Sequence, residues 1–304
     1  MRVAVVGLGD IARKAYLPVL AARGDVELIF CTRDRETLGR LSRAYRVSEV
    51  TTDYRELPGR GVEAAFVHTS TESHAEVASE LLRGGLHVHL DKPISYTYEE
   101  SVAVVEAAER AGRVLAVGFN RRFAPMYAGL KAKPGRRLVL MQKNRAYLPE
   151  HPRRFVFDDF IHVADTLRFL CPAEALAERV TFFTQEGLLR HLTLHLEGDG
   201  FAAFGVMNRD SGADEEVLEV MSPGNKWDVR GLDVTTHYTG GEERVRRFRN
   251  WDTVLHRRGF PQMVEHFLEL AGGRGDAPSA LRDALQTHAL CERIVARIEG
   301  GQRL

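Results

Sequence analysis

Hydrophobic and polar positions follow two different patterns along the chain. From residue 2 to about residue 118, short β-branched runs alternate with longer amphipathic stretches. This alternation is typical of repeated βαβ units and a parallel sheet. The predicted strands are 3–6, 26–31, 64–68, 87–90 and 114–117, and the predicted helices include 11–22, 73–83 and 98–111. The first part of the chain therefore predicts a doubly wound α/β sheet.

The pattern changes after Asn120. A helix predicted at about 158–169 is followed by alternating segments such as 191–196 and 201–206, separated by Gly and Asp turns, which indicate antiparallel sheet. Residues 260–270 and 280–298 return to helical spacing. We expect residues 1–119 to form a Rossmann-type domain. Residues 120–304 are expected to form an α+β domain with a large, mostly antiparallel open sheet, whose last helices can pack back on the first domain.

Composition narrows the class of protein. A chain of 304 residues predicts about two domains, and 44% hydrophobic with 28% charged residues excludes a disordered or membrane-spanning protein. The 42 basic residues balance 42 acidic ones, so neither nucleic acid nor an anionic membrane is an expected partner. Cys31, Cys171 and Cys291 are widely separated, as buried reduced thiols would be, and no export signal is visible. We expect a cytoplasmic protein.

The first predicted strand runs directly into a glycine-rich turn that opens a helix. The turn reads Gly7-Leu8-Gly9-Asp10-Ile11-Ala12, a G-x-G-x-x-A pattern. The first glycine permits a tight turn, the second lets a pyrophosphate approach the backbone, and the alanine keeps the helix close to the sheet. We predict that Gly7, Gly9, Asp10 and Ile11 bind a dinucleotide; the alternative is a structural turn.

The second predicted strand ends where the adenosine ribose would be recognised, and a carboxylate there would favour NAD. The chain reads Phe30-Cys31-Thr32-Arg33-Asp34 at this point. Thr32 and Arg33 can donate to a 2′-phosphate, and a charge-assisted hydrogen bond is worth roughly 1.5–3 kcal/mol, or about 10- to 150-fold in affinity. This predicts NADP(H). If the strand ends one residue later, Asp34 takes the ribose and NAD is preferred; Arg33 would then be a solvated residue at a helix start.

Two further segments carry candidate chemistry. Asp91-Lys92-Pro93 follows the strand 87–90, at the carboxyl edge of the sheet where open α/β folds place ligands. A cis Lys92–Pro93 bond would fix the ammonium toward that crevice. Asp158 and His162 are four residues apart on the predicted helix, so they share one face. The carboxylate can orient the imidazole and raise its basicity, which makes His162 a candidate general base.

Together these motifs resemble the Gfo/Idh/MocA family of oxidoreductases, named for glucose-fructose oxidoreductase, inositol dehydrogenase and a rhizopine catabolism protein. The resemblance spans nearly the whole chain. It rests on the Gly7 turn, on Asp91-Lys92-Pro93 where the family usually has Glu-Lys-Pro, on Val117-Gly118-Phe119-Asn120-Arg121-Arg122-Phe123, and on Asp158 with His162. Within the family the chain looks like the MviM-like virulence-factor oxidoreductases, through Phe66-Val67-His68-Thr69-Ser70-Thr71, Asp158-Asp159 before His162, and Arg257-Arg258-Gly259-Phe260.

The resemblance implies roles for individual residues. Lys92 would position the substrate hydroxyl or carbonyl, His162 would exchange its proton, and Asp158 would support His162. The implied cofactor contacts are Thr69, Ser70, His74, Asp91, Asn120 and Arg121. Arg122 is expected at the substrate together with the three catalytic residues. Relatives commonly form a homodimer or homotetramer through the open C-terminal sheet.

The chain departs from the family in ways that bear on the substrate. Asp91 is one methylene shorter than the usual Glu, and Phe160 stands where many relatives carry Gly, so we expect Phe160 to narrow the substrate pocket. Arg121, Arg122 and Arg145 could meet an anionic substrate such as a uronate or a phosphorylated sugar, although arginines at such positions are more often ion-pair partners.

Other candidate sites are weaker. His191 and His195 share one face of a predicted strand, but a metal needs more ligands and none is suitably spaced, so we expect no metal. The basic run 244–249 is interrupted by Val245 and Phe248 and predicts a solvated strand face.

The leading hypothesis is an NADP(H)-dependent dehydrogenase or reductase that transfers a hydride between nicotinamide and a hydroxyl or carbonyl carbon. The resemblance implies a small-molecule substrate like a sugar or cyclitol. The alternative is a non-catalytic NAD(P)-binding redox sensor or regulatory protein of the same fold.

Overall fold

The computed structural model describes residues 1–301, without the side chains of residues 277–280. The chain divides into two compact units. The first consists of Met1–Gly118 with Phe260–His288, and the second of Phe119–Gly259 with Ala289–Leu304. Residues 260–288 thus belong with the N-terminal part of the chain. The assignment of residues 1–119 and 120–304 to two domains remains a prediction.

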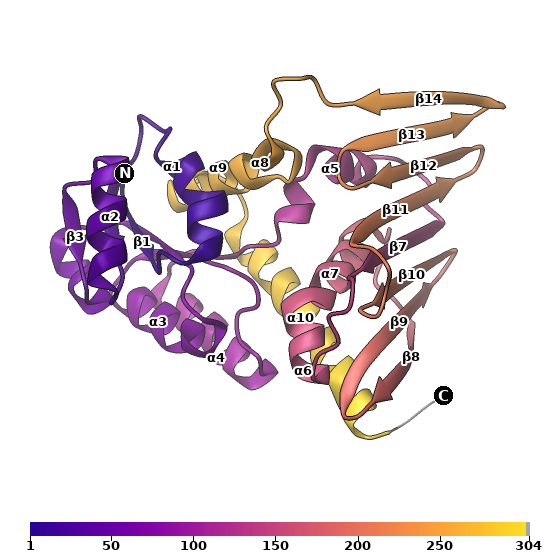
Figure 1. The fold of residues 1–304 in the computed structure, drawn as a ribbon, viewed down its shortest axis with the longest axis horizontal. Helices are drawn as coiled ribbons and strands as arrows, with labels where there is room; N and C mark the ends of the chain where they lie inside the picture. The colour runs from indigo at the N-terminus through magenta and orange to yellow at the C-terminus, as the bar shows by residue number, and fades with distance from the viewer. Residues whose placement is uncertain (302–304) are drawn as a thin grey trace. The chain divides into compact units, whose positions relative to one another are not determined.

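The first unit contains a six-stranded parallel sheet of order β3-β2-β1-β4-β5-β6 (Figure 1). Its strands are β1 (Arg2–Val6), β2 (Glu27–Cys31), β3 (Glu49–Thr51), β4 (Ala64–Val67), β5 (His87–Leu90) and β6 (Leu115–Val117). Its helical segments are η1 (Ala12–Tyr16), α1 (Leu17–Leu20), α2 (Arg35–Tyr45), η2 (Tyr54–Glu56), η3 (Pro58–Arg60), α3 (Thr71–Arg83), α4 (Tyr98–Ala111), α9 (Phe260–Ala271) and the first part of α10 (Ala277–Glu299). The predicted doubly wound parallel sheet is confirmed.

The central strands of this sheet, from Val3 to Val6 in β1 and from Ala64 to Val67 in β4, are continuously apolar, as expected where helices cover both faces. Val3, Val5 and all four residues of β4 are fully buried. Burying one such valine contributes roughly 1.5–3 kcal/mol. Strand β3 was not predicted from the sequence. It is three residues long and buries only Thr51, so it is too short to show an alternating hydrophobic pattern.

The second unit contains an eight-stranded sheet of order β14-β13-β12-β11-β7-β10-β9-β8. Its strands are β7 (Leu138–Asn144), β8 (Ala177–Gln185), β9 (Leu188–Gly198), β10 (Phe201–Asn208), β11 (Glu215–Ser222), β12 (Asn225–Arg230), β13 (Val234–Thr239) and β14 (Glu242–Arg247). Its helical segments are η4 (Asn120–Phe123), α5 (Pro125–Lys131), α6 (Pro152–Arg154), η5 (Phe155–Phe160), α7 (Ile161–Leu170) and α8 (Val254–Arg257). All neighbouring strands are antiparallel except β7 and β10. The predicted α+β architecture with a mostly antiparallel sheet is confirmed.

Helix α7 packs on β7 and β10. The face that the sheet turns toward its helices is apolar, as the buried Leu192, Leu194 and Leu196 on β9 illustrate. Gly205 on β10 allows the close approach of α7, because a Cβ there would lie 2.6 Å from a methyl carbon of Val163. Phe160, expected to narrow a substrate pocket, is fully buried, and its ring lies 3.7 Å from that same Cβ position. It belongs to the core between helix and sheet.

Two predicted helices begin with wider turns than expected. The segment after the glycine turn is a π-helix, η1, before it continues as α1. The helix predicted at 158–169 likewise starts as the π-helix η5 and continues as α7. π turns inside helices are frequent at functional sites, and both of these lie at candidate motifs.

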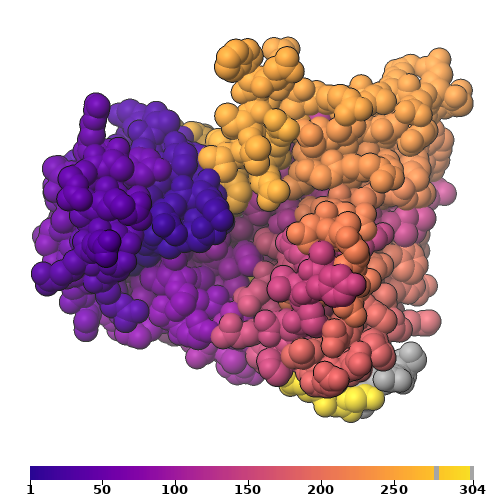
Figure 2. Space-filling model, in the orientation of Figure 1, coloured from indigo at the N-terminus to yellow at the C-terminus, as the bar shows by residue number. Residues whose placement is uncertain are grey.

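Several smaller expectations can be compared directly with the structure. All six residues of β14 are exposed, as predicted for the basic run, and the strand lies at the surface (Figure 2). Cys31, Cys171 and Cys291 are buried and free, and burial raises the pKa of each thiol. Among the helices of the described residues, none combines the length and the apolar character that a membrane crossing needs.

Candidate functional site

The glycine turn after β1 has a geometry that other residues cannot adopt. Gly7 has φ of +87°, and a Cβ there would lie 2.7 Å from the backbone of His68 and Thr69. Its N–H donates to the carbonyl of Cys31 at 2.8 Å. A Cβ on Gly9, in contrast, would meet nothing within 4 Å. The turn is therefore closed against the sheet at Gly7 and open at Gly9, which fits the approach of a pyrophosphate.

The other two predicted residues of this turn are at the surface. Asp10 forms an ion pair with Lys14 at 2.8 Å, and Ile11 is 37% exposed. Both are accessible to a ligand lying along the turn.

The end of β2 clarifies the position of Asp34. The strand ends at Cys31, and Asp34 is the N-cap of α2. Its Oδ1 accepts hydrogen bonds from the backbone N–H groups of Glu36 at 3.0 Å and Thr37 at 3.2 Å. The bonds from Thr37 hold the pKa of Asp34 below its usual range. The Asp34 carboxylate is thus hydrogen-bonded to the first turn of α2, while the Arg33 side chain is exposed.

The segment after β5 contains the predicted cis Lys92–Pro93 bond. Asp91 precedes it and accepts a hydrogen bond from the Tyr16 hydroxyl at 3.3 Å. Burial raises the pKa of Asp91, and the charge of Lys92 opposes that rise. A side chain on Gly118 would collide with Asp91 and with the Tyr16 hydroxyl, at 2.9 and 3.1 Å. Asp91 is thus fixed inside its unit, and Lys92 beside it is half-buried.

His74 joins two parts of the predicted site. Its Nδ1 lies 2.7 Å from the carbonyl oxygen of Pro93, and its Nε2 lies 3.1 Å from that of Thr69. His288 holds the next residue, because its Nε2 accepts from the backbone N–H of Ile94 at 2.9 Å. His74 was expected at the cofactor; both ring nitrogens instead face backbone carbonyls. Thr69 and the exposed Ser70 remain at the open end of β4.

Tyr16, Phe66, His68 and His89 form a buried cluster of aromatic and histidine rings that was not predicted from the sequence. The ring centroids of Tyr16 and His68 are 3.9 Å apart, and those of Phe66 and His89 are 5.0 Å apart. Neither ring nitrogen of His68 or His89 has a hydrogen-bond partner within the described residues. Burial lowers the pKa of both imidazoles, that of His89 to about 3. The alternation of Phe66 with His68, beside that of His87 with His89, was the available sequence signal.

In the second unit, the catalytic candidates Asp158 and His162 are both partly accessible. Between Phe155 and Leu167, Asp158 and His162 are the two residues that are not buried. The Thr166 hydroxyl donates to the backbone carbonyl of His162 at 2.7 Å. Asp158 lies in the π-helix η5, and His162 lies in the first turn of α7. Both side chains are therefore partly accessible within a segment whose other residues are buried.

Buried ion pairs surround this helix. Asp159 accepts from Lys143 and from Arg145, whose Nε lies 2.8 Å from Oδ2. Arg122 donates to Asp165, with Nε 2.9 Å from Oδ2. Lys143 and Asp165 are almost completely buried. These pairs fix the helix that carries the catalytic candidates.

A second pair involves Arg121. Its Nε and Nη2 donate to the two carboxylate oxygens of Glu216 at 2.9 and 2.7 Å, and the Tyr127 hydroxyl donates to Glu216 at 3.0 Å. Burial raises the pKa of Glu216, but the charge and hydrogen bonds of Arg121, the charge of Lys143 and the hydrogen bond from Tyr127 together lower that pKa to about 2. Arg121 was expected at the cofactor and Arg122 at the substrate. Both guanidinium groups are bound to carboxylates of their own unit.

Two motifs that carry the family resemblance pack against each other. The Asn120 side-chain amide donates to the carbonyl of Arg258 at 2.8 Å. Gly259 has φ of +81°, and a Cβ there would lie 2.5 Å from the backbone of Asn120 and Ala124. The Asn120–Phe123 turn and the loop before α9 therefore pack closely and are joined by a hydrogen bond. Asn120 was predicted at the cofactor, and its side-chain amide nitrogen makes this hydrogen bond.

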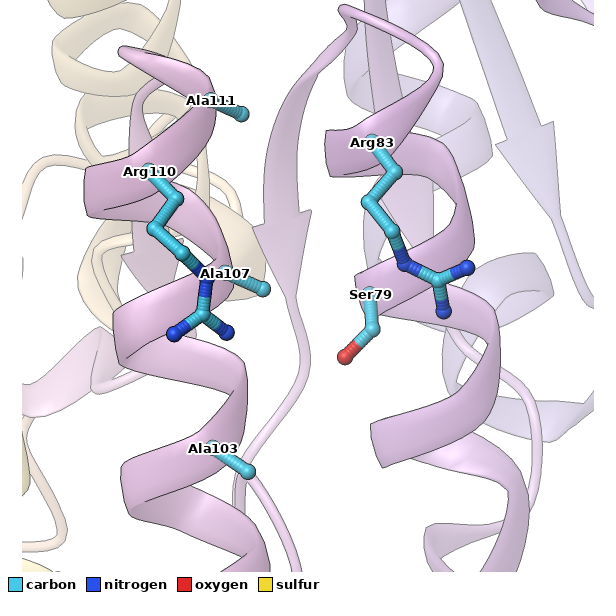
Figure 3. Close-up of a pocket in the computed structure, with 6 residues that line it drawn as sticks. All are labelled: Ser79, Arg83, Ala103, Ala107, Arg110 and Ala111. Atoms are coloured by element: carbon cyan, nitrogen blue, oxygen red, sulfur yellow. The ribbon is translucent and has the colours of Figure 1, made fainter.

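A surface hollow of about 520 Å³ lies between α3 and α4 (Figure 3). It is lined by Ser79, Arg83, Ala103, Ala107, Arg110 and Ala111. Its two arginines form ion pairs within their own helices, Arg83 with Glu80 and Arg110 with Glu106. None of the predicted site residues lines this hollow. Among the described residues, no group of three or more His, Cys, Asp or Glu side chains is arranged to hold a metal ion.

A glycine turn of this geometry in a six-stranded parallel sheet, joined to a unit with an open mixed sheet, defines a nucleotide-binding α/β protein of two units. Residues 1–119 match the family model of the GFO_IDH_MocA oxidoreductases with an NAD-binding Rossmann fold, and residues 125–239 match the YceM-like C-terminal domain. The chain belongs to the Gfo/Idh/MocA family of NAD-binding oxidoreductases. The predicted family is confirmed.

Individual relatives cover almost the whole chain. YceM of Salmonella typhimurium, named as an oxidoreductase, is 32% identical over 97% of this chain and 96% of its own length. The myo-inositol dehydrogenase Hyg17 of Streptomyces leeuwenhoekii is 28% identical over 96% and 97%. A Gfo/Idh/MocA oxidoreductase structure from Vibrio cholerae is 32% identical, covers 99% of both chains and has a TM-score of 0.94. The MviM dehydrogenase structure from Clostridium difficile is 27% identical over 97% and 99%, with a TM-score of 0.92, which confirms the MviM-like resemblance.

Proposed function

We propose that this oxidoreductase is an NADP(H)-dependent dehydrogenase or reductase that acts on a hydroxyl or carbonyl carbon of a sugar- or cyclitol-like substrate. The observation that carries the proposal is that Asp158 and His162 are the two partly accessible residues of an otherwise buried helical segment. Hydride transfer from a carbinol carbon needs a base for the hydroxyl proton, and an accessible imidazole can serve as that base.

Each candidate has a role in this chemistry. The nicotinamide, when bound, supplies or accepts the hydride. His162 takes the hydroxyl proton in oxidation and returns it in reduction, and Asp158 orients the imidazole and stabilises its charged form. Lys92 donates a hydrogen bond to the substrate oxygen and stabilises negative charge on it.

The NADP(H) preference rests on the end of β2. Asp34 caps α2 with its carboxylate, so the residue that would favour NAD is already engaged. Arg33 is exposed and Thr32 half-exposed beside it, where both can donate to a 2′-phosphate. Arg33→Ala should raise KM for NADP about 10- to 150-fold and leave KM for NAD nearly unchanged. Equal KM changes for both nucleotides would refute the preference.

The cofactor contacts follow the same geometry. Gly7, Gly9, Asp10 and Ile11 form the open turn, and Thr69, Ser70 and Asp91 lie at the ends of β4 and β5. His74, Asn120 and Arg121 remain proposed cofactor contacts and Arg122 a proposed substrate contact, although their side chains also bond within their own units. The substrate class is supported by the relatives named for inositol and by the polar pair at His162.

A homodimer or homotetramer through the C-terminal sheet is part of the proposal, as is a cytoplasmic location. The sheet face opposite α7 presents half-exposed apolar side chains on three adjacent strands, namely Leu138, Leu140, Phe204, Val206 and Met221. Apolar surface of this kind is commonly covered by a second subunit.

The decisive experiment follows nicotinamide absorbance while the protein is offered a panel of sugars, cyclitols and their oxidised forms. With a substrate found, His162→Ala should lower kcat about 10²- to 10⁴-fold, and Lys92→Ala should lower kcat/KM. The exposed His151→Ala serves as the matched control and should retain full activity. Full turnover by His162→Ala would remove the mechanism. Tight NADPH binding with no turnover across the panel would favour the redox sensor instead.

A further inference from the structure

Arg209, directly after β10, is a buried cation, and two of its three guanidinium nitrogens have no hydrogen-bond partner among the described residues. The residue is 7% exposed. Its backbone is fixed, because its N–H donates to the carbonyl of Arg190 and its own carbonyl accepts from Leu148, at 2.8 and 2.7 Å. Within the described residues, neither Nε nor Nη1 of its guanidinium has a hydrogen-bond partner. The guanidinium lies over the ring of Phe155, 5.2 Å from the ring centroid.

The nearby charges do not neutralise it. Lys143 and Arg145 both bind the single carboxylate of Asp159, and Arg121 is bound to Glu216. Glu150 and Asp158 act on Arg209 only through longer-range attraction, while burial lowers its pKa. The charge of Arg209 also acts on Arg145. Three cations, Lys143, Arg145 and Arg121, thus share the two carboxylates of Asp159 and Glu216.

Such an arrangement is costly unless something else uses it. A buried charge without a bonded counter-ion is strongly disfavoured, and buried donors are nearly always paired. A planar guanidinium offers parallel N–H donors that match a carboxylate or a phosphate. Arg145 lies in the same cluster, with its side chain 32% exposed, and supplies a second positive charge. Since the described residues supply no such partner, an anionic ligand would complete the site.

The position of Arg209 connects this anion to the candidate catalytic pair. Phe155, over which the guanidinium lies, starts the π-helix that contains Asp158. Asp158 is also one of the two carboxylates whose charge acts on Arg209. An anion bound here would lie near the proposed general base, yet its charge would be balanced by Arg209 and would not weaken the basicity of His162 through repulsion.

From this geometry we infer that Arg209 binds an acidic group of the substrate, a carboxylate or a phosphate ester carried on the polyhydroxylated molecule. This inference rests on the proposed function and specifies its substrate class as an acidic sugar or cyclitol. Binding an acidic ligand differs from a purely structural role, in which the Arg209 guanidinium would bond to a partner within the protein.

The test compares three ligands that differ at one carbon. D-glucose, D-glucuronate and D-glucose 6-phosphate are titrated calorimetrically into the full-length protein saturated with NADPH. The wild type should bind one of the two acids at least tenfold more tightly than glucose, and the choice between carboxylate and phosphate identifies the acidic group. Arg209→Met should weaken that acid about 10- to 150-fold and leave glucose unchanged. Arg137→Met, an exposed arginine before the opposite end of β7, is the matched control.

Thermal unfolding separates binding from stability. Because Arg209→Met removes a buried charge that has no hydrogen-bonded counter-ion among the described residues, its unfolding midpoint should stay the same or rise, whereas replacing a structural arginine would lower it. If Arg209→Met does not fold, Arg209→Lys tests the inference. Lysine keeps the positive charge but lacks the paired donors of the guanidinium, so the preference for the acid over glucose should still fall severalfold.

The outcomes also separate this inference from the proposed function. If neither acid binds better than glucose, or if Arg209→Met weakens all three ligands equally, the inference is overturned, even where neutral polyols are oxidised. If the acid binds through Arg209 but no hydride transfer occurs with any substrate, the inference holds and the proposed enzymatic function fails. With turnover, Arg209→Met should raise KM for the acid far more than it lowers kcat.

Discussion

Replacing His89 with leucine should make the protein less sensitive to acid. His89 is 0% exposed in the sheet of the first unit, and neither ring nitrogen has a partner among the described residues. Burial lowers its pKa to about 3, against about 6.5 in an unfolded chain. The unfolded state therefore binds a proton more readily than the folded state. The stability from the neutral imidazole is complete above about pH 6.5 and is lost as the pH falls toward 3.

The size of this effect follows from linkage. At pH 5 an unfolded histidine is almost fully protonated, while the buried one is neutral, which costs the folded state about 2 kcal/mol; at pH 7 the cost is only a few tenths. His68 has its pKa lowered in the same direction by the same burial and adds to the acid sensitivity. His89→Leu replaces the ring with an apolar group of similar volume. Between pH 7 and pH 5, the free energy of unfolding of His89→Leu should therefore fall by about 2 kcal/mol less than that of the wild type.

Urea unfolding followed by far-ultraviolet circular dichroism at pH 7, 6 and 5 measures this difference. His89→Leu should keep its stability at pH 7, because removing two unpaired buried nitrogens offsets the changed packing. The exposed His151→Leu should follow the wild type at every pH. If the stability curves of His89→Leu and the wild type run parallel from pH 7 to pH 5, His89 is not held neutral by burial and the reasoning is refuted.

Three further substitutions test other parts of the structure. Gly7→Ala places a Cβ 2.7 Å from the backbone after β4 at a φ of +87°, so it should lower stability by about 1–3 kcal/mol and abolish NADPH binding in a fluorescence titration; retained binding would contradict the role of the turn. Asp159→Asn leaves Lys143 and Arg145 without their carboxylate and should cost about 3–5 kcal/mol in urea unfolding; a cost under about 1 kcal/mol would mean that the pairs contribute little. Asp34→Ala should cost about 1 kcal/mol through loss of the α2 cap and leave the ratio of NADP to NAD affinity unchanged; a shifted ratio would show that Asp34 reads the ribose.

Local sequence patterns were sufficient wherever a structure depends on neighbours along the chain. The helix predicted at 98–111 has the same bounds in the structure, because Thr97 caps its start and Gly112 takes the left-handed conformation at its end. The glycine turn and the cis proline could be predicted for the same reason. The edge strand β3 could not, since three residues with one buried position carry no detectable period.

The candidate site was only partly visible in the sequence. The spacing of Asp158 and His162 predicted a shared helix face, and the structure gives both an accessible position there. Nothing near Arg121 indicated that it would bind Glu216, because the two are 95 positions apart. The unpaired state of Arg209 was equally hidden, since it depends on where every neighbouring carboxylate lies.

By itself the sequence determined the two kinds of sheet, the nucleotide turn and the family, because these follow from residue spacing and turn chemistry over short distances. Only the tertiary structure decided which arginines form ion pairs with carboxylates, which histidines are buried without hydrogen-bond partners among the described residues, and that Asp34 caps a helix. Those properties depend on burial and on strand register between distant segments, which set the local dielectric and the partners of each charge.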